Sequence, residues 1–358
     1  MPPKLKILYI GILAPEGFST CTQRLRALEA LGHDVVGLDT VPPHVQRRQA
    51  SLVGRAVRGL LGPVDWAGVN RAARRAAQRE RFDVLWVDAG RTIDAKTLRG
   101  FKRHSPGTLL VHYNPDDPFG GLSHDWGRFM PALPLFDVHL VPRIVNLADY
   151  RAAGARRVVQ VVPFWGFAPN VHRPVAVEAT ERQRLHAPVG FVGMAEEQRA
   201  RSLARLAEAG VGVKIWGDGW ETWKKRLNAR FELAGPSQWG DPYARILSST
   251  DISVAFLRKA NRDLHTSRSI EIPACGGFML AERSTEHTRL FEEGREAAYF
   301  GDDDELIDKV RYFLAHPDER SRIAAAGHAR CLAEYGNTRL MERLLSAAFA
   351  ETGASASS

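Results

Sequence analysis

The stretch "KILYIGILAPEGFSTCTQRLRALEALGHDVVGLD", residues 6–39, indicates the fold class of this chain. Two short apolar runs lie within it, at 6–13 and at 34–39. Short runs rich in Val, Ile and Leu that are flanked by Gly and Asp are typical of strands buried on both faces of a sheet. The stretch therefore predicts a strand, a connection and a second strand of the same sheet.

The connection between these strands has the pattern of a helix over 22–32. Leu25, Leu28 and Leu31 recur on one helical face, and Gly32 is a natural helix stop. Strand, helix and strand in this order predict a parallel, doubly wound α/β sheet. The same alternation continues through the first half of the chain, where further strand candidates lie at 83–90, 108–114, 137–142 and 157–164.

A polar segment punctuated by proline, 165–188, interrupts the alternation, which then starts again. We predict two doubly wound domains facing across a cleft, with boundaries at 1–165, 166–335 and 336–358, the last being a C-terminal helix and a disordered tail ending in "GASASS". The second domain has strand candidates at 189–195, 211–219, 251–257, 277–282 and 297–302, helix candidates at 196–210 and 241–250, and a helical C-terminal part of 55 residues.

The composition is that of a soluble globular protein, with 358 residues, 44% hydrophobic and 25% charged. No apolar run reaches the roughly 18–20 residues of a membrane span. The N-terminus carries two lysines and an apolar run, but no small-residue cleavage site follows, so we interpret it as a strand instead of a signal peptide. Cys21, Cys275 and Cys331 are scattered and odd in number, which predicts reduced thiols in the cytoplasm and argues against disulfides or a zinc site.

The net charge of +8 is concentrated in residues 41–81, where nine arginines stand against Asp65 and Glu80. Such a segment attracts an anionic lipid surface, nucleic acid or an acidic substrate, and a solvated helix face is the alternative. Leu52, Val53 and Trp66 stand among these arginines, as in an interfacial helix. We therefore expect peripheral contact with an anionic membrane, through Arg47, Arg48, Arg55 and Arg58, although glycines at 54, 59 and 62 argue against a continuous helix there.

Three glycine-containing turns follow strand candidates, where open α/β sheets bind ligands. Gly11, Gly193 and Gly217 mark these turns, and Arg199 opens the helix after the second of them. None has the G-x-G-x-x-G spacing of a dinucleotide site, and simple turn geometry would explain each glycine equally well.

The segment "DLHTSRSIEIPACGGFML", 263–280, carries the strongest chemical signal. Thr266 and Ser267 are expected to cap a helix that carries Arg268 and Glu271 about one turn apart. A phosphate there would meet hydroxyls, backbone N–H groups and a guanidinium, and the carboxylate could accept from two vicinal hydroxyls of a ribose. The alternative is an exposed Arg–Glu pair worth a few tenths of a kcal/mol.

The run from 263 to 335, together with "FVGMAEEQR" at 191–199 and "IWGDG" at 215–219, resembles the C-terminal domain of GT-B glycosyltransferases of the "group 1" type. It looks most similar to the branch of spore-maturation-protein-like glycosyltransferases. The resemblance implies transfer of a sugar from a nucleotide-sugar donor bound by the C-terminal domain, with the acceptor on the N-terminal domain. The acceptor would be a glycan, a lipid-linked molecule or another hydroxyl compound.

In this family a Glu-x7-Glu pair brackets the corresponding helix, the second Glu binding the ribose and the first the transferred sugar. The resemblance places Glu271 at the second position and Asp263, one methylene shorter, at the first. It also favours transfer with retention of configuration.

Transfer of this kind leaves a nucleoside diphosphate, whose growing negative charge requires cations close to it. Arg268, Arg199 and Lys259 are the candidates, and no metal or other cofactor is expected. The acidic run of "GDDDEL" could hold a metal through Asp302 and Asp304, but we interpret it as a helix start, where acidic residues complement the dipole.

In the first domain, "VHYNPDDPFG", 111–120, is expected to leave a strand into the cleft. With inversion, Asp116 or Asp117 would be the general base; with retention, His112 or a main-chain carbonyl would contact the sugar. The alternative is an Asx-turn made by Asn114 and Asp117. Asp88 is a lesser candidate for an acceptor contact.

Two other functions use the same features. A nucleotide-sugar 2-epimerase would share the fold and the nucleotide site. A nucleic-acid-binding protein would use the arginine segment, but it would lack aromatic stacking platforms, because only Trp66 lies there.

Overall fold

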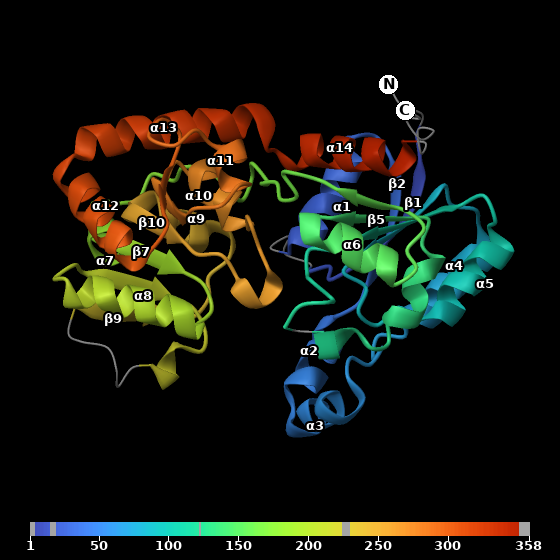
Figure 1. Cartoon of the computed structure of the whole chain (residues 1–358). Helices are drawn as coiled ribbons and strands as arrows, with labels where there is room; N and C mark the ends of the chain where they lie inside the picture. The colour runs from blue at the N-terminus through green and yellow to red at the C-terminus, as the bar shows by residue number, and fades with distance from the viewer. Residues whose placement is uncertain (1–3, 15–18, 122, 224–229, 351–358) are drawn as a thin grey trace. The chain divides into compact units, whose positions relative to one another are not determined.

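The structure is a computed structural model that describes residues 4–14, 19–121, 123–223 and 230–350 (Figure 1). The predicted disordered tail lies outside these residues. The chain forms two compact units, and each consists of segments that are distant in sequence. Unit 1 comprises Met1–Phe164, Lys259–Arg262 and Asn337–Ser358; unit 2 comprises Trp165–Arg258 and Asp263–Gly336.

Unit 1 contains a six-stranded sheet whose order is β2-β1-β3-β4-β5-β6, with every neighbouring pair parallel. Its central strands are buried almost throughout, because helices cover both faces of the sheet. The strands are β1 (Lys6–Gly11), β2 (Asp34–Asp39), β3 (Val84–Asp88), β4 (Leu109–Tyr113), β5 (Val138–Val141) and β6 (Val158–Gln160).

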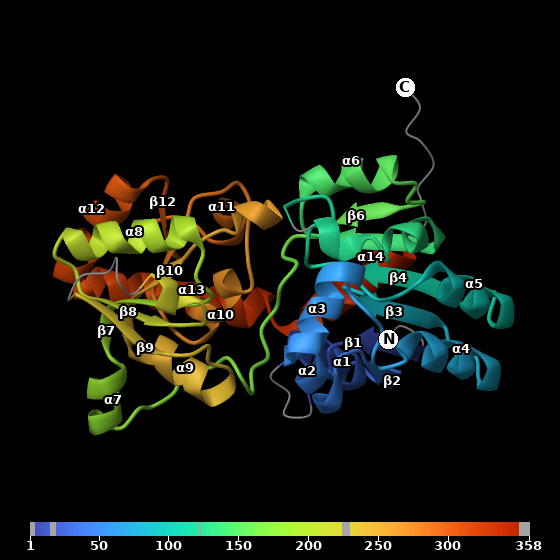
Figure 2. The same cartoon turned by 90° about the horizontal axis from the view of Figure 1, so that it is seen from below.

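The helices of unit 1 divide between the two faces of this sheet. α4 and α5 lie side by side and pack on one face, and α1 packs against α14 on the other (Figures 1 and 2). The reversal of strand order after β2 requires this division if every crossover is right-handed. The helices are α1 (Thr20–Ala30), α2 (Pro43–Ala50), α3 (Leu52–Leu61), α4 (Val69–Arg79), α5 (Ala95–His104), α6 (Ile144–Ala152) and α14 (Asn337–Phe349).

Unit 2 contains a second six-stranded parallel sheet, with the order β12-β11-β10-β7-β8-β9. Apolar residues of α8 and α12 cover one face and form the core with the strands. The strands are β7 (Ala187–Val192), β8 (Val213–Trp216), β9 (Phe231–Gly235), β10 (Thr250–Ala255), β11 (Met279–Glu282) and β12 (Ala298–Phe300).

The helices of unit 2 include a short helix, α10, that carries the residues of greatest chemical interest. α10 packs on α13, and α8 packs on α12. The helices are α7 (Ala179–Leu185), α8 (Glu197–Glu208), α9 (Gly240–Ser249), α10 (Arg268–Ala274), α11 (His287–Leu290), α12 (Asp303–Ala315) and α13 (Pro317–Glu334).

The predicted α/β class with two doubly wound sheets is confirmed. Eleven strand predictions correspond to strands of the structure, whereas β9 was not predicted. β9 is an edge strand whose second residue is the exposed Glu232, so it lacks the continuous apolar run of a central strand. The helix expected at 22–32 begins earlier, at Thr20, because the Ser19 side chain caps it.

The arginine-rich segment is more helical than its glycines suggest. α3 runs through Gly54 and Gly59 and ends before Gly62, whose φ is +68°. A Cβ on Gly54 would lie 2.0 Å from the carbonyl oxygen of Arg48, so glycine permits α2 and α3 to pack closely. The expected interruption at 54 and 59 is therefore wrong.

Within the described ranges, no helix combines the length and apolar character that crossing a membrane requires. Cys21, Cys275 and Cys331 are all free and buried.

Candidate functional site

Two glycines bring backbone segments together at the carboxyl ends of adjacent strands in unit 2. Gly193 follows β7 and Gly217 follows β8. A Cβ on Gly217 would lie 1.9 Å from the carbonyl oxygen of Gly193, so no other residue fits without movement of the backbone. The Trp220 Nε1–H donates to this same oxygen at 2.8 Å. The two turns therefore form a fixed edge against which side chains of α8 and α10 are positioned.

Positive charge gathers at this edge. The Arg268 Nε–H donates to the carbonyl oxygen of Val192, at the end of β7. Burial lowers the pKa of the Arg199 guanidinium; Glu196 acts in the opposite direction, and the nearby charges of Arg268 and Arg258 lower the pKa further. Because the positive charges of Arg268 and Arg258 disfavour the charge of Arg199, an anionic ligand beside these three side chains would be favoured.

Two buried polar atoms beside this cluster lack hydrogen-bond partners. They are Nε of Arg199 and Oγ1 of Thr266, and the statement covers the described residues. A buried guanidinium nitrogen without an acceptor is costly, since the desolvation of its N–H is not compensated. An oxygen-rich ligand would supply that acceptor.

The expected capping of α10 is wrong. Ser267 occupies the N-cap position, but its φ of −58° and ψ of −37° are already helical, and its side chain makes no capping bond. Thr266 does not cap through its hydroxyl either; its backbone N–H instead donates to the Ser269 hydroxyl at 3.0 Å. Thr266 and Ser267 are half-buried residues beside Arg268, and neither side-chain hydroxyl caps the helix.

Glu271 is a buried carboxylate, only 8% exposed. Its Oε2 accepts a hydrogen bond of 2.9 Å from the Tyr243 hydroxyl, and its Oε1 lies 3.8 Å from His172 Nε2. Burial raises the pKa of Tyr243 and lowers the pKa of His172, and the Glu271 charge raises both. Glu271 is too buried to be the exposed partner of Arg268, so the alternative of a surface Arg–Glu pair is excluded.

A polar network beneath α10 fixes its first turn. The Ser269 hydroxyl and His287 Nε2 are 2.6 Å apart, and His287 Nδ1 lies 2.6 Å from the carbonyl oxygen of Glu282. Beside this pair, His265 Nδ1 and Glu286 Oε2 are 2.5 Å apart. All these groups are buried, so the segment that carries Arg268 and Glu271 is held in one geometry.

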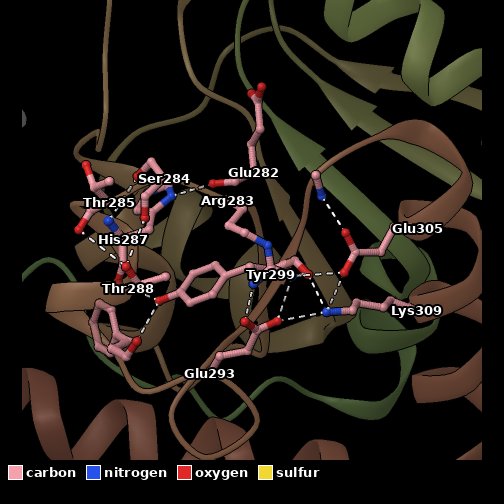
Figure 3. Close-up of polar contacts among 12 residues, drawn as sticks. Glu282, Arg283, Ser284, Thr285, His287, Thr288, Glu293, Tyr299, Glu305 and Lys309 are labelled. Atoms are coloured by element: carbon pink, nitrogen blue, oxygen red, sulfur yellow. Dashed lines mark hydrogen bonds and ion pairs between the residues drawn. The ribbon is translucent and has the colours of Figure 1, made fainter.

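Figure 3 shows how the segment after β11 is held in turn. The Tyr299 hydroxyl donates to the carbonyl oxygen of His287 at 2.7 Å. Lys309 lies 2.8 Å from Glu293 and 2.9 Å from Glu305, while Arg283 bonds to both carboxylates. The two cations and two carboxylates neutralise one another, so we interpret them as ion pairs that stabilise the segment after β11 and not as a ligand site.

Asp263 and Lys259 fall on different units. Asp263 is half-buried in unit 2, and its charge raises the pKa of Arg199. Lys259 is exposed and belongs to unit 1. Asp263 therefore belongs to the unit that carries the cationic cluster, and Lys259 belongs to the other unit.

The acidic run at 302–304 begins a helix, as interpreted from the sequence. The Asp302 side chain caps α12 by accepting from the N–H of Glu305 at 2.8 Å. Asp303 and Asp304 form ion pairs with Arg205 at 3.5 and 2.6 Å. Among described residues, no group of three or more metal-ligating side chains is arranged to hold an ion.

In unit 1, the segment after β4 contains the Asx geometry that was the alternative for this loop. Asn114 Oδ1 accepts from the Asp116 N–H at 3.1 Å, and Asp117 Oδ1 accepts from the Phe119 N–H at 3.0 Å. Asp116 Oδ2 lies 2.5 Å from Arg91, and its side chain remains 25% exposed. Asp116 is therefore the carboxylate of this loop that solvent and ligands can reach.

Asp117 has a different environment, with a side chain that is fully buried. Arg262 bonds to both of its oxygens, and Asn146 donates to Oδ1 at 2.9 Å. Burial opposes ionisation, but these bonds outweigh it, and the pKa of Asp117 is lowered. A saturated carboxylate of low pKa is a poor proton acceptor, so Asp117 anchors the segment Lys259–Arg262 within unit 1.

The expectation that His112 reaches a ligand is corrected by its burial. His112 lies inside β4 with no exposed surface. Its Nδ1 is 2.8 Å from His139 Nδ1, and its Nε2 is 2.9 Å from the carbonyl oxygen of Ala89. Burial, followed by the charge of His139, holds the pKa of His112 well below its usual range. It is a neutral core histidine.

Gly11 ends β1 where no side chain would fit easily. A Cβ there would lie 3.2 Å from Cys21 and 3.3 Å from Asp88, so glycine at this position allows the side chains of Cys21 and Asp88 to pack against the end of β1. Asp88 is buried and lies 2.8 Å from Arg24, which makes it part of an internal ion pair. Neither observation assigns a ligand to Gly11.

Several residues near the candidate site were missed from the sequence: Tyr243, His172, Arg258 and Arg262. Tyr243 lies on α9 and the others lie in loops, and the residues next to them in the sequence form no recognisable motif. Only the folded chain brings them beside Glu271, Arg199 or Asp117.

Comparison with known proteins gives a family match for part of the chain. Residues 198–346 match a family model described as "Glycosyl transferase-like". This span contains α10, nearly all of α8 and the run 263–335 that resembled a glycosyltransferase by its motifs, but only the end of the segment 191–199. No curated protein matches the chain significantly.

Solved structures match nearly the whole chain at low sequence identity. Anabaena Alr3699/HepE, solved in complex with UDP-glucose, has a TM-score of 0.64 at 14% identity, covering 96% of this chain and 99% of that one. Sucrose-phosphate synthase from Thermosynechococcus elongatus has a TM-score of 0.66 at 13% identity, covering 96% and 98%. A Listeria monocytogenes protein provisionally named as a UDP-N-acetylglucosamine 2-epimerase has 0.54 at 14%, covering 96% of each.

These matches establish the fold, which is that of GT-B glycosyltransferases. The family match adds that residues 198–346 are similar to a glycosyltransferase-like family.

Proposed function

We propose that this protein is a glycosyltransferase that takes its sugar from a nucleotide-sugar donor bound by unit 2. The observation that carries the proposal is the unpaired, buried Nε of Arg199 beside Arg268, within the segment that matches the glycosyltransferase-like family. A diphosphate would provide oxygen acceptors for these guanidinium groups. The binding of UDP-glucose by Alr3699/HepE supports the same class of donor.

In this proposal each side chain has one role. Arg199 and Arg268 neutralise the charge that grows on the leaving diphosphate. Glu271, oriented by Tyr243, accepts hydrogen bonds from ribose hydroxyls. Asp263, whose charge acts on Arg199, contacts the transferred sugar. Arg258 adds positive charge without being a direct contact.

The acceptor is proposed to bind unit 1 beside Asp116. With inversion at the anomeric carbon, Asp116 would take the proton of the acceptor hydroxyl, because it is partly exposed whereas Asp117 is fully buried and saturated with hydrogen bonds. We nevertheless favour transfer with retention of the anomeric configuration, because the chain resembles the group 1 enzymes. The branch of spore-maturation-protein-like enzymes is likewise kept as a prediction.

We propose that transfer needs no metal ion. Support comes from the guanidinium groups at the proposed diphosphate position and from the structural use of Asp302, Asp303 and Asp304. The role that a metal plays in other transferases would here be taken by arginine.

A nucleotide-sugar 2-epimerase is the second candidate, because one structural neighbour carries that provisional name. The two functions differ in their need for an acceptor. An epimerase converts the donor alone, whereas a transferase releases nucleoside diphosphate in proportion to acceptor glycosylated. A time course with donor alone, followed by chromatography of the sugar nucleotide, separates them.

We further propose that α3 contacts an anionic membrane surface. Four of its apolar side chains are unusually exposed: Leu52 (77%), Val53 (71%), Leu60 (85%) and Leu61 (66%). Arg55 and Arg58 of the same helix are exposed, and Arg47 lies on α2 nearby in sequence. Apolar and basic side chains on one helix suit the interface of a bilayer rich in anionic lipid. Arg48 contributes less, because its guanidinium stacks 3.7 Å from the Trp66 ring.

A thermal-shift screen of nucleoside diphosphates and sugar nucleotides tests the proposed donor class. A ligand present at 100 times its dissociation constant should stabilise the protein by about 2.7 kcal/mol. If no member of the panel stabilises the protein, the donor proposal is wrong.

A further inference from the structure

A second concentration of positive charge lies in unit 1, in a groove between α4 and α5. The groove has a volume of about 640 Å³ and is lined by six basic side chains. These are Arg71, Arg74 and Arg75 of α4, and Lys96, Arg99 and Arg103 of α5. α4 and α5 lie side by side in both views (Figures 1 and 2).

The two helices run in the same direction, and polar side-chain contacts join them at two places along the groove. Arg74 donates to the Thr97 hydroxyl at 2.8 Å, and Gln78 lies 3.4 Å from His104 one turn later. Lys96 and Arg103 of α5 are about two turns apart, and each turn advances 5.4 Å, so the line of charges extends over about 10 Å.

A small residue keeps the helices close at this place. Gly100 of α5 faces Arg74, and a Cβ on Gly100 would lie 3.0 Å from Cδ of that arginine. The aliphatic part of Arg74 therefore packs on the glycine, and its charged end is directed by the bond to Thr97. The floor of the groove is thus built, and not simply a gap between mobile side chains.

The charges of the groove are not neutralised within the chain. Across the part of the chain that the structure describes, no carboxylate lies within 4.0 Å of any of the six basic groups. Neither α4 nor α5 contains an acidic residue. Arginines elsewhere on the surface behave differently; Arg205, for example, contacts both Asp303 and Asp304. An ordinary solvated helix would intersperse acidic residues at i+3 or i+4.

We propose that the α4–α5 groove is a binding site for a compact ligand that carries two or more phosphate groups. Five of the six cations are arginines, whose planar guanidinium groups match phosphate oxygens in pairs. The volume lies in the range of small-molecule sites. The proposal is independent of the proposed transferase activity, since it uses no residue of the donor site in unit 2.

Other anionic partners fit the groove less well. No Phe, Tyr or Trp lines it, and His104 is its one aromatic ring, so it lacks the series of stacking surfaces that single-stranded nucleic acid uses. Its concave shape favours a discrete ligand over a flat bilayer surface. The phosphates could belong to a soluble polyphosphate or to the headgroup of a phosphorylated lipid, because both present the same oxygens.

Calorimetric titration of the full chain with inorganic tripolyphosphate at low salt tests the site. The groove variant combines Arg71→Gln, Arg75→Gln and Arg99→Gln. The matched control variant loses the same charge on the surface of unit 1, through Arg26→Gln, Arg128→Gln and Arg151→Gln. We expect wild type and control to bind equally, and the groove variant to bind at least about tenfold more weakly.

Three outcomes overturn the proposal: no binding by wild type, equal weakening in the groove and control variants, or unchanged binding by the groove variant. In the last case, loss of tripolyphosphate binding in Arg199→Gln would assign the anion to unit 2 instead. A parallel co-sedimentation with vesicles of neutral lipid, with and without a polyphosphorylated phosphoinositide, distinguishes the two sources of phosphate. Groove-dependent binding to the phosphoinositide vesicles as well as to tripolyphosphate would assign the lipid headgroup; groove-dependent binding in the titration alone would assign a soluble ligand.

Discussion

The Tyr243 hydroxyl of α9 donates a 2.9 Å hydrogen bond to Glu271 Oε2 on α10, the helix that also carries Arg268. One carboxylate oxygen is thus fixed by α9, while the other lies 3.8 Å from His172. A buried carboxylate held in this way is oriented without being neutralised by an arginine. Its remaining acceptor positions are available to a ligand.

Removal of that hydroxyl should weaken nucleotide binding without unfolding unit 2. We expect Tyr243→Phe to lower the affinity for the nucleoside diphosphate by about tenfold, because Glu271 loses its orienting bond. Tyr312→Phe is the matched control, since its hydroxyl bonds to exposed Glu319. Equal affinity of the two variants, measured by calorimetry, would show that the orientation of Glu271 is irrelevant.

The two aspartates after β4 should respond differently to substitution. Asp116→Asn is expected to reduce transfer strongly while changing the unfolding midpoint little, because the partly exposed ion pair of Asp116 with Arg91 contributes little to stability. Asp117→Asn should destabilise unit 1 by about 3 kcal/mol, since it leaves Arg262 without its buried partner. Initial rates and urea denaturation separate the two effects, and a loss of activity confined to Asp117→Asn at full stability contradicts this division of roles.

Chelation of divalent ions should leave transfer intact. The reason is that arginines, and not carboxylates, gather at the proposed diphosphate position. Rates are compared before and after dialysis against EDTA. Activity that disappears with EDTA and returns with Mn²⁺ would show that the proposed metal independence is wrong.

Binding to anionic vesicles should depend on α3. The variant with Arg47, Arg48, Arg55 and Arg58 changed to Gln is expected to remain in the supernatant, while wild type co-sediments with vesicles rich in anionic lipid at low salt. Each arginine near such a surface contributes about 1 kcal/mol. A second variant, Leu60→Ser with Leu61→Ser, tests the exposed apolar side chains. If wild type also stays in the supernatant, α3 does not contact membranes.

Stability should fall as the pH falls below about 6.5, in part because of His287. Burial lowers the pKa of folded His287 to about 4, and the charge of nearby His265 acts in the same direction. Below pH 6.5 the unfolded chain binds a proton that folded His287 does not, so each pH unit down to about 4 removes roughly 1.4 kcal/mol of stability. Urea midpoints at pH 7.5 and 5 should differ less for His287→Gln than for wild type. Equal differences would show that His287 does not contribute.

Sequence patterns were sufficient for the sheets because their strands are buried on both faces and lie between clear helical segments. The edge strand β9 was missed, since exposed Glu232 breaks its apolar run. The arginine-rich segment was also misjudged, because a glycine that permits two helices to pack looks identical in sequence to one that ends a helix.

The site was harder to predict than the fold. Arg199, Arg268, Glu271 and Asp263 could be selected from motifs, and the structure associates them within unit 2. His112 was misinterpreted because a polar side chain at the end of a strand gives no sign of the buried partner, His139, that satisfies it. Tyr243 and Arg262 could not be found, as their importance comes only from contacts with residues far away in sequence.

The most direct measurement of the central claim is calorimetric titration with nucleoside diphosphates of the five common bases. Wild type should bind at least one of them, and Arg199→Gln and Glu271→Ala should each weaken that binding by about tenfold or more. Arg201→Gln, which alters an exposed arginine of the same helix, should bind like wild type. If the diphosphate binds all four proteins equally, the donor is not held by Arg199 and Glu271, and the proposed site in unit 2 is wrong.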